Sequence, residues 1–197
     1  MKAIIHRIVA IPFIYNLVQN ILGERKAHDL IRKEIACVKT LDKVLDIGGG
    51  TGLSRQLLPA KTWYVCLDVD PQKLHGFRQQ FPAEAALLGD ATQSALQSNS
   101  FDAIVCVSVS HHLHNNQLPA LFDECKRILK PNGQLIFWDA VWDTRKLTGQ
   151  ALWSLDRGAY PHTEKLLRDL IAARFSIGVW QNPSIWHNYV LCRAIRN

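Results

Sequence analysis

The sequence has 197 residues, a formal net charge of +6 and a hydrophobic content of 48%. This length suits one compact domain with a real core and leaves little room for a second, and the ordinary composition excludes a disordered or fibrous chain. Lys and Arg are scattered in runs of at most two residues, which favours a solvated basic surface over a nucleic-acid or membrane partner. The charge also remains compatible with an anionic substrate.

The first residues, MKAIIHRIVAIPFIYNLVQNIL, form an apolar but interrupted stretch. His6, Arg7 and Pro12 break it and no small-residue cleavage site follows, so we expect neither a signal peptide nor a membrane span. Apolar residues at helical spacing predict two short amphipathic helices. We expect them to pack on the domain as a partial lid over the site; an interfacial membrane contact is the alternative.

The five cysteines show neither CxxC spacing nor a cluster with histidine. Cys66 and Cys106 lie in apolar runs, where cysteine behaves as a small hydrophobic residue. The odd number and these positions predict a reduced, cytoplasmic protein without disulfides and without a metal site.

Segments with helical and with strand-like patterns alternate along the rest of the chain. The expected helices cover residues 25–38, a segment starting near 53, 71–81, 118–129 and 164–175. The expected strands cover residues 43–47, 63–70, 85–90, 101–110, 134–140, 175–181 and 187–195, with a turn at 130–133. This alternation predicts an α/β fold with a doubly wound, mainly parallel, Rossmann-like sheet of seven strands. The loop between the last two strands is too short for a parallel crossover, so the seventh strand should lie antiparallel.

The turn after the first expected strand contains four glycines in the five positions from Gly48 to Gly52. Its GxGxG spacing differs from the dinucleotide fingerprint, whose third glycine lies one residue later, where this chain has Leu53. A tight turn that needs positive φ would explain one or two of these glycines, but not four. A buried strand that leads through such a turn into a helix therefore predicts a nucleotide-like ligand close to the backbone.

Acidic residues lie at or near the ends of the first three expected strands. Asp68 ends the second strand, where a carboxylate can accept hydrogen bonds from both ribose hydroxyls of a nucleoside. Asp70 precedes Pro71 and is interpreted as a helix N-cap. Asp46 and Asp90 complete the set, because parallel strands bring their carboxyl ends to one rim. Each acid alone could be a cap or turn residue, but together they favour a binding site.

The segments LDIGGGTG, CLDVDPQKL, LLGDATQ, FDAIVCVSVSHHL and LKPNGQLIF resemble, in order, the motifs of class I S-adenosylmethionine-dependent methyltransferases of the small-molecule type. The resemblance covers approximately residues 41–137, and the antiparallel last strand fits the same family. It implies that S-adenosylmethionine lies along the strand tips and is converted to S-adenosylhomocysteine (SAH).

The resemblance also implies a role for individual residues of this chain. Asp46 and the turn glycines would approach the methionine portion, and Asp68 would hold the ribose, with Val69 beside it. Asp90 and Ala91 would meet the adenine, and the backbone near Val107 and Ser108 would line the sulfonium. Tyr15, in the first helices, would be a lid contact. The complete set of expected cofactor-binding residues is Tyr15, Asp46, Gly48, Gly49, Gly50, Gly52, Asp68, Val69, Asp90, Ala91, Val107 and Ser108.

His111 and His112 follow the fourth expected strand, where the methyl acceptor should lie. Imidazole titrates near neutrality, so either residue could remove a proton from a hydroxyl or amine. The alternative is that the pair only closes the loop, because a similar pair occurs across the family with different acceptors. His162 and His187 are weaker candidates.

The acceptor should be recognised by residues 139–163, the least conventional part of the chain. Its aromatic residues could wall a pocket or could simply pack on the sheet. Asp156 and Arg157 could anchor an acidic acceptor or form a surface ion pair. The candidate wall residues are Trp138, Trp142, Trp153 and Tyr160.

We therefore expect one methyltransferase domain over residues 1–197, with a helical lid (1–38), a cofactor-binding core (39–138), an acceptor-side insertion (139–163) and a closing helix and hairpin (164–197). The expected reaction moves a methyl group from S-adenosylmethionine to O, N or C of a small apolar or aromatic acceptor. The alternatives are an RNA or other macromolecule methyltransferase and a non-catalytic S-adenosylmethionine-binding protein; the glycine spacing disfavours a nicotinamide oxidoreductase. No nucleic-acid partner is expected, and either a monomer or a homodimer is compatible with the sequence.

Overall fold

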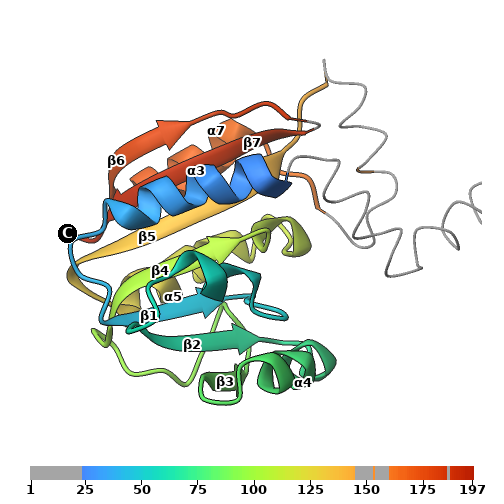
Figure 1. Cartoon of the computed structure of the whole chain (residues 1–197). Coiled ribbons are helices and arrows are strands. Elements are labelled where there is room, and N and C mark those ends of the chain that lie inside the picture. Colours follow the sequence, from blue (N-terminus) through green and yellow to red (C-terminus); the bar gives the residue numbers. More distant parts are fainter. Residues whose placement is uncertain (1–23, 145–152, 154–159, 186) are drawn as a thin grey trace, which may run out of the picture.

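A computed structural model of the chain describes residues 24–144, 153, 160–185 and 187–197. A seven-stranded sheet runs through this part of the chain, with helices on both of its faces (Figure 1). The strand order is β3-β2-β1-β4-β5-β7-β6. This arrangement confirms the doubly wound α/β fold predicted from the sequence.

The described elements follow the expected order along the chain. The strands are β1 (Lys43–Ile47), β2 (Trp63–Asp68), β3 (Ala85–Leu88), β4 (Phe101–Val107), β5 (Leu129–Val141), β6 (Ser176–Gln181) and β7 (Asn188–Ile195). The α-helices are α3 (Glu24–Ala36), α4 (Pro71–Gln80), α5 (Leu118–Ile128) and α7 (Glu164–Ala172). Two short 3₁₀ helices, η1 (Leu53–Leu57) and η2 (Ser110–His112), follow β1 and β4.

One strand of the described sheet runs against the others. β1 pairs in parallel with β2 and β4, β2 with β3, and β4 with β5. β7 lies between β5 and β6 and is antiparallel to both. The prediction of an antiparallel seventh strand is therefore confirmed, and its cause is the short connection from β6.

The core is divided between the two faces of the sheet. On one face, apolar residues of α5 and α7, such as Phe122 and Ile171, pack against alternate residues of the strands, such as Ile104. On the other face, α3 and α4 supply Ile35 and Phe77 against the remaining strand residues. Strands covered on both faces explain why β4 is apolar almost throughout.

The segment after the glycine turn is shorter than a normal helix. The sequence predicts a helix starting near residue 53, whereas the structure contains only η1, which ends at Leu57. Leu58 is extended, with φ −101° and ψ 152°, because the following Pro59 disfavours the α conformation of the residue before it.

Two of the expected strands end early for local reasons. β2 stops at Asp68, since Asp70 already caps α4 through hydrogen bonds from the amides of Gln72 and Lys73. β4 stops at Val107, because Ser108 has a φ of 57°. The residues that follow turn into η2 instead of extending the strand.

The expected turn at residues 130–133 is a bulge inside β5. The register with β4 passes from Leu129 opposite Phe101 to Gln134 opposite Ala103. Asn132, at the tip of the bulge, has a φ of 63° and donates its amide to the carbonyl of Arg196.

Some predictions concern residues outside the described ranges. The two N-terminal helices, Tyr15, Asp156 and Arg157 all lie there, and so does most of the segment 145–159. The division of the chain into four functional segments therefore stays a prediction. Among the helices that the structure does describe, none has the length and apolar character needed to cross a bilayer.

Candidate active site

The residues that the sequence singles out meet at one edge of the sheet. β1, β2, β3 and β4 are neighbours and run parallel, so their carboxyl ends share this edge. The amide of Gly50, after β1, donates to Oδ2 of Asp68, at the end of β2, over 2.9 Å. The glycine turn and the tip of β2 are therefore in direct contact, as a ligand-binding edge of an open α/β sheet requires.

Most of the turn glycines are required by the packing of the chain itself. Gly48 and Gly52 have φ values of 65° and 91°, which other residues rarely adopt. A Cβ at Gly48 would overlap the side chain of Val109, and one at Gly52 would lie 2.7 Å from the Phe77 ring. A Cβ at Gly49 would lie 2.7 Å from a carboxylate oxygen beneath the turn. Internal packing thus explains more of these glycines than we expect from the sequence.

Gly50 differs from the other three glycines. Its φ is 54°, and a Cβ placed there would meet nothing closer than Lys73 Cδ at 3.8 Å and Asp68 Oδ2 at 3.9 Å. A Cβ at Gly50 would thus make only ordinary van der Waals contacts, beside the Asp68 carboxylate. The need for glycine at this position comes from its positive φ and not from crowding by neighbouring side chains.

Asp68 holds the turn and keeps capacity for further hydrogen bonds. Its side chain accepts the amide of Gly50 on Oδ2 and the amide of Asp70 on Oδ1, the latter over 2.8 Å. A carboxylate offers about four acceptor positions in all. The two protein donors therefore leave unused acceptor capacity on each oxygen of this side chain, which is 5% exposed.

The Asp46 carboxylate lies beneath the glycine turn and is only 1% exposed. Its Oδ2 accepts a hydrogen bond from the hydroxyl of Tyr64, on β2. Burial raises the pKa of Asp46 to about 7, against the opposing effect of hydrogen bonds from Tyr64 and Ser54, and the nearby charge of Asp68 raises it further. Asp46 thus supports the turn from below.

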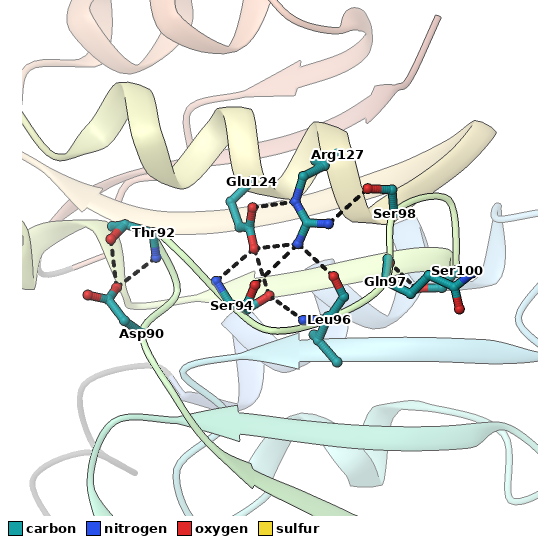
Figure 2. A network of polar contacts seen from close by, with 9 residues as sticks. All are labelled: Asp90, Thr92, Ser94, Leu96, Gln97, Ser98, Ser100, Glu124 and Arg127. Atoms are coloured by element: carbon teal, nitrogen blue, oxygen red, sulfur yellow. Dashed lines mark hydrogen bonds and ion pairs between the residues drawn. The ribbon is translucent and has the colours of Figure 1, made fainter.

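The third acid, Asp90, begins the loop after β3. It is exposed, and its Oδ1 accepts the amide and the hydroxyl of Thr92 over 2.7 and 2.8 Å (Figure 2). The next residue, Ala91, is half-buried against the core. Val69 and Leu53, which follow Asp68 and the glycine turn, are 75% and 54% exposed. The edge therefore combines acidic groups with exposed apolar side chains.

The tip of β4 connects the glycine turn to the next strand. Val107 is half-buried and Ser108 is exposed, and the amide of Ser108 donates to the carbonyl of Trp138 over 2.8 Å. Beyond it, Val109 contacts the position of Gly48. The backbone around Val107 and Ser108 thus lies next to the turn, and its role in lining the sulfonium stays a prediction.

His111 and Asp139 form a buried pair at the end of β4 and β5. His111 Nδ1 lies 2.6 Å from Asp139 Oδ1, and the two residues are 8% and 0% exposed. The other oxygen of Asp139 accepts the amide of Ser110 over 2.7 Å and its hydroxyl over 2.6 Å. Burial alone would raise the pKa of Asp139, but His111 and these hydrogen bonds lower it below its usual value.

An ionised Asp139 determines which tautomer of His111 is present. Because the carboxylate can only accept, Nδ1 of His111 carries the proton and donates it to Asp139. In the neutral ring Nε2 is then the basic nitrogen. His112 is placed differently: it is exposed, and its ring centroid lies 4.1 Å from that of His111.

A second buried histidine holds the segment after residue 159 against η2. His162 is 1% exposed, and its Nε2 lies 2.9 Å from the carbonyl oxygen of Ser110, which can only accept, so Nε2 donates. Its Nδ1 lies 2.8 Å from Asn115 Oδ1, and the amide of Tyr160 donates to the carbonyl of His111 over 2.6 Å. His162 therefore supports the loop that carries His111.

Aromatic rings form a connected row beside this pair. The ring centroids of Trp138 and Tyr189 are 4.8 Å apart, those of Tyr189 and His187 5.9 Å, and those of His187 and Trp153 5.0 Å. Trp153 reaches His111 over 5.8 Å. The sequence singles out Trp138 and Trp153 as possible wall residues. The structure connects them through Tyr189 and His187, of which the sequence analysis omits the first and treats the second as a weaker candidate.

Asp139 and Tyr189 are the functional candidates that sequence reasoning misses. Asp139 lies in the apolar segment QLIFWDA, and Tyr189 in the segment HNYVLCRAI. The signal that could have identified Asp139 is its position as an acid in an otherwise apolar, buried strand. A buried acid needs a hydrogen-bond or ionic partner. Burial first and the charge of Asp139 second raise the pKa of Tyr189 to about 12, so its hydroxyl stays protonated.

The comparison with protein families agrees with this geometry. Residues 45–137 match the family model described as a methyltransferase domain, a range that contains the glycine turn, Asp68, Asp90 and His111. This part of the chain is therefore similar to methyltransferase domains. The matched range runs from β1 into β5, and Asp139, His162 and the aromatic row all lie beyond it.

Curated relatives share mainly the methyltransferase domain. An uncharacterized methyltransferase of Mycobacterium tuberculosis is 36% identical over 105 residues, which cover 52% of this chain and 40% of the relative. A probable phthiotriol/phenolphthiotriol dimycocerosates methyltransferase of Mycobacterium ulcerans is 27% identical over 164 residues, covering 70% and 62%. The chain thus spans less than two thirds of the length of these relatives.

Solved structures extend the likeness of the methyltransferase domain to the whole fold. The crystal structure of magnesium protoporphyrin IX methyltransferase from Synechocystis PCC 6803 with bound SAH has a TM-score of 0.74 at 18% identity and covers 100% of both chains. At this identity the likeness shows the class I methyltransferase fold. Among the described residues, no cluster of three or more His, Cys, Asp or Glu side chains is arranged to hold a metal ion.

Proposed function

We propose that this protein transfers a methyl group from S-adenosylmethionine to an O, N or C atom of a small apolar or aromatic acceptor. The observation that carries the proposal is the contact between Gly50 and Asp68 at the carboxyl edge of the parallel strands, inside the range that matches a methyltransferase domain. Close internal packing accounts for the other turn glycines, whereas a Cβ at Gly50 would meet its neighbours only at 3.8 Å or more.

The residues at the edge suit the parts of an adenosyl ligand. The remaining acceptor positions of Asp68 suit the two ribose hydroxyls, and the exposed apolar atoms of Val69 and Leu53 suit the adenine ring. Asp90 and Ala91 would meet the adenine edge, and the backbone of the glycine turn the methionine portion. Asp46 would act on that portion only through the turn, because its carboxylate is buried.

S-adenosylmethionine supplies a methyl group on a sulfonium, which is already a strong electrophile. The work left to the protein is alignment of the acceptor and, where that atom carries a proton, removal of the proton. The backbone near Val107 and Ser108 would line the reacting end, next to the glycine turn. The acceptor would enter between this backbone and the His111 loop.

We assign proton removal to His111. Asp139 fixes the proton on Nδ1, so Nε2 can accept a proton from the acceptor, and the positive charge formed on the ring lies 2.6 Å from a buried carboxylate. The contact with Asp139 is the observation that selects His111, on whose ring the exposed His112 stacks. The proposed catalytic role thus narrows from the histidine pair to His111.

The aromatic row is the proposed wall of the acceptor site. Trp138, Tyr189, His187 and Trp153 present stacked and edge-on rings that lead to His111. Trp153 also has a buried indole N–H without a hydrogen-bond partner in the described part of the chain, which an acceptor oxygen could satisfy. Relatives named for methylating phthiotriol dimycocerosates, and a neighbour named for magnesium protoporphyrin IX, support a small-molecule acceptor.

The proposed function is tested in two steps. Calorimetric titration with SAH and with NAD should give a saturable signal for SAH alone; binding of NAD instead would contradict the proposal. Protein with labelled S-adenosylmethionine is then offered phenols, apolar alcohols, amines, isoprenoids and total RNA. Transfer to a small molecule supports the proposal, whereas salt-sensitive transfer to RNA would favour the macromolecule alternative.

We propose a cytoplasmic location, supported by the free thiols buried in the core at Cys66, Cys106, Cys125 and Cys192. These buried thiols are free and form no disulfide that an oxidising compartment would be needed to maintain. Cell fractionation with a tagged full-length protein tests the location, and recovery in a secreted or membrane fraction would contradict it. Both a monomer and a homodimer are compatible with this proposal.

A further inference from the structure

The loop between β3 and β4, residues 89–100, carries Asp90 and Ala91 and has no regular secondary structure. Its beginning is held by a bond from the amide of Gly89 to the carbonyl of Asp68. Its end is held by the amides of Asn99 and Ser100, which donate to carbonyls at the end of α5. The centre of the loop needs another support.

Two side chains of α5 supply that support (Figure 2). Glu124 Oε1 accepts both the amide and the hydroxyl of Ser94, each over 2.7 Å. Arg127 Nη2 donates to the carbonyl of Leu96 over 2.7 Å, and its Nη1 donates to Ser98 Oγ over 2.9 Å. The two side chains thus hold the centre of the loop through both backbone and hydroxyl groups.

Glu124 and Arg127 also orient each other. Arg127 Nε donates to Glu124 Oε2 and Nη2 to Glu124 Oε1, each over 2.7 Å. Glu124 is only 8% exposed, whereas 37% of the Arg127 side chain is exposed, so the carboxylate is the shielded partner of the pair. The inner edge of the guanidinium holds Glu124 while its outer edge reaches the loop, which needs the planar fork of arginine.

Resting on the proposed function, we propose that Arg127, together with Glu124, is a positioning residue for the adenine end of the cofactor. Neither side chain belongs to the rim itself. They act through the loop, by fixing the path of the chain that follows Asp90 and Ala91. The affinity for the cofactor then depends on a charged pair on α5, which does not itself touch the cofactor.

The chain contains a matched control that bonds the same helix from another part of the chain. Arg174 donates from Nε and Nη2 to Asp123 over 2.7 and 3.0 Å and from Nη1 to the carbonyl of Leu170 over 3.0 Å. It is therefore another arginine that holds a carboxylate of α5 with two nitrogens and bonds a carbonyl. It connects α5 to α7 and touches no residue of the 89–100 loop in the described contacts.

The test compares Arg127→Lys with Arg174→Lys. Arg127→Lys keeps the charge but loses the fork, so the Kd for SAH should rise about fivefold to tenfold, with kcat at saturating S-adenosylmethionine almost unchanged. Arg174→Lys should lower thermal stability without changing the Kd. An unchanged Kd in Arg127→Lys, or an equal rise in both variants, would overturn the proposal.

Hydrogen exchange in cofactor-free protein gives a readout that does not need binding. Amides of residues 91–98 should exchange faster in Arg127→Lys than in the wild type and Arg174→Lys. If the wild type binds no SAH, the proposed function fails, and the exchange data still decide whether the pair holds the loop. Equal exchange in all three proteins would contradict that role.

Discussion

The two halves of the sheet edge each contain a fully buried carboxylate, and the environments shift the two pKa values in opposite directions. Under the glycine turn, burial raises the pKa of Asp46 to about 7, and its described hydrogen-bond partners are the neutral hydroxyls of Tyr64 and Ser54. At the end of β5, Asp139 faces His111 and has a lowered pKa despite equal burial. The first acid supports a backbone turn, whereas the second is suited to stabilising a charged imidazole.

The difference follows from how each half is assembled. The glycine-turn half is held by bonds among residues 46–70, inside the matched methyltransferase domain. The His111 half joins segments far apart in the sequence, such as Ser110 with His162, and reaches beyond the matched range. Cofactor binding is therefore expected to be a family property, and acceptor chemistry a property of this chain.

The largest expected effect comes from a substitution in the His111 half, at Asp139. Asp139→Asn removes the acceptor that fixes the His111 tautomer, so kcat for a proton-bearing acceptor should fall about 10²- to 10⁴-fold. The Kd for SAH should stay within about twofold of the wild-type value, because the glycine-turn half is untouched. Steady-state kinetics with the acceptor found by screening, together with calorimetry, measure both.

The control for this variant is Asp102→Asn. Asp102 is also a buried acid, 8% exposed, but it lies at the opposite end of β4, where it binds Lys130 and the amide of Lys43. The Asp102→Asn variant should be less stable than the wild type but should keep the wild-type kcat. Normal turnover in Asp139→Asn would show that the histidine pair only closes the loop.

The corresponding substitution in the glycine-turn half is Asp68→Ala. It removes the acceptors for both ribose hydroxyls, so the Kd for SAH should rise about a hundredfold. Asp70→Ala is the matched control, since Asp70 only caps α4 and its loss should cost about 1 kcal/mol of stability without changing the Kd. An equal effect of both variants would contradict the ribose assignment.

The raised pKa of Asp46 predicts a pH-dependent stability. In the unfolded chain this carboxyl titrates near 3.8, and in the folded protein near 7. Its contribution is therefore complete below the unfolded value and is lost as the pH rises towards 7, at a slope of at most about 1.4 kcal/mol per pH unit. Asp139, with a lowered pKa, contributes in the opposite sense, and its stabilisation is lost as the pH falls.

Asp46→Asn isolates this effect. The difference in the free energy of unfolding between the wild type and Asp46→Asn should change steadily between pH 4 and pH 7, in favour of the wild type at low pH. Urea unfolding at several pH values measures it. Parallel pH profiles for the two proteins would show that Asp46 titrates normally.

The smallest expected effect concerns the aromatic row. Tyr189→Leu removes the ring stacked on Trp138, so the KM for a ring-containing acceptor should rise about threefold to tenfold while the Kd for SAH stays the same. Tyr189→Phe keeps the ring and should behave as the wild type. A large fall in kcat for Tyr189→Phe would instead assign a chemical role to the hydroxyl.

Most of the fold could be predicted from the sequence, because alternating periodicity and short loops determine the layers and the antiparallel β7. The early end of β4 could not, since a serine gives no local signal of the positive φ that Ser108 adopts. The turn glycines and Asp68 were recognisable because they are close in sequence. The His111–Asp139 pair was not, because no local pattern in QLIFWDA shows which partner an acid meets across the sheet.

The position of β7 has a consequence for how the protein is made. Of the described strands it is synthesised last, yet it is inserted between β5 and β6, and Val190 is the register partner of Asp139. A nascent chain that has emerged from the ribosome only as far as β6 exposes two unpaired strand edges, which are prone to aggregate. Premature termination before Asn188 would therefore yield an insoluble product, and the strand that carries Asp139 gains its second neighbour only after β7 has been synthesised.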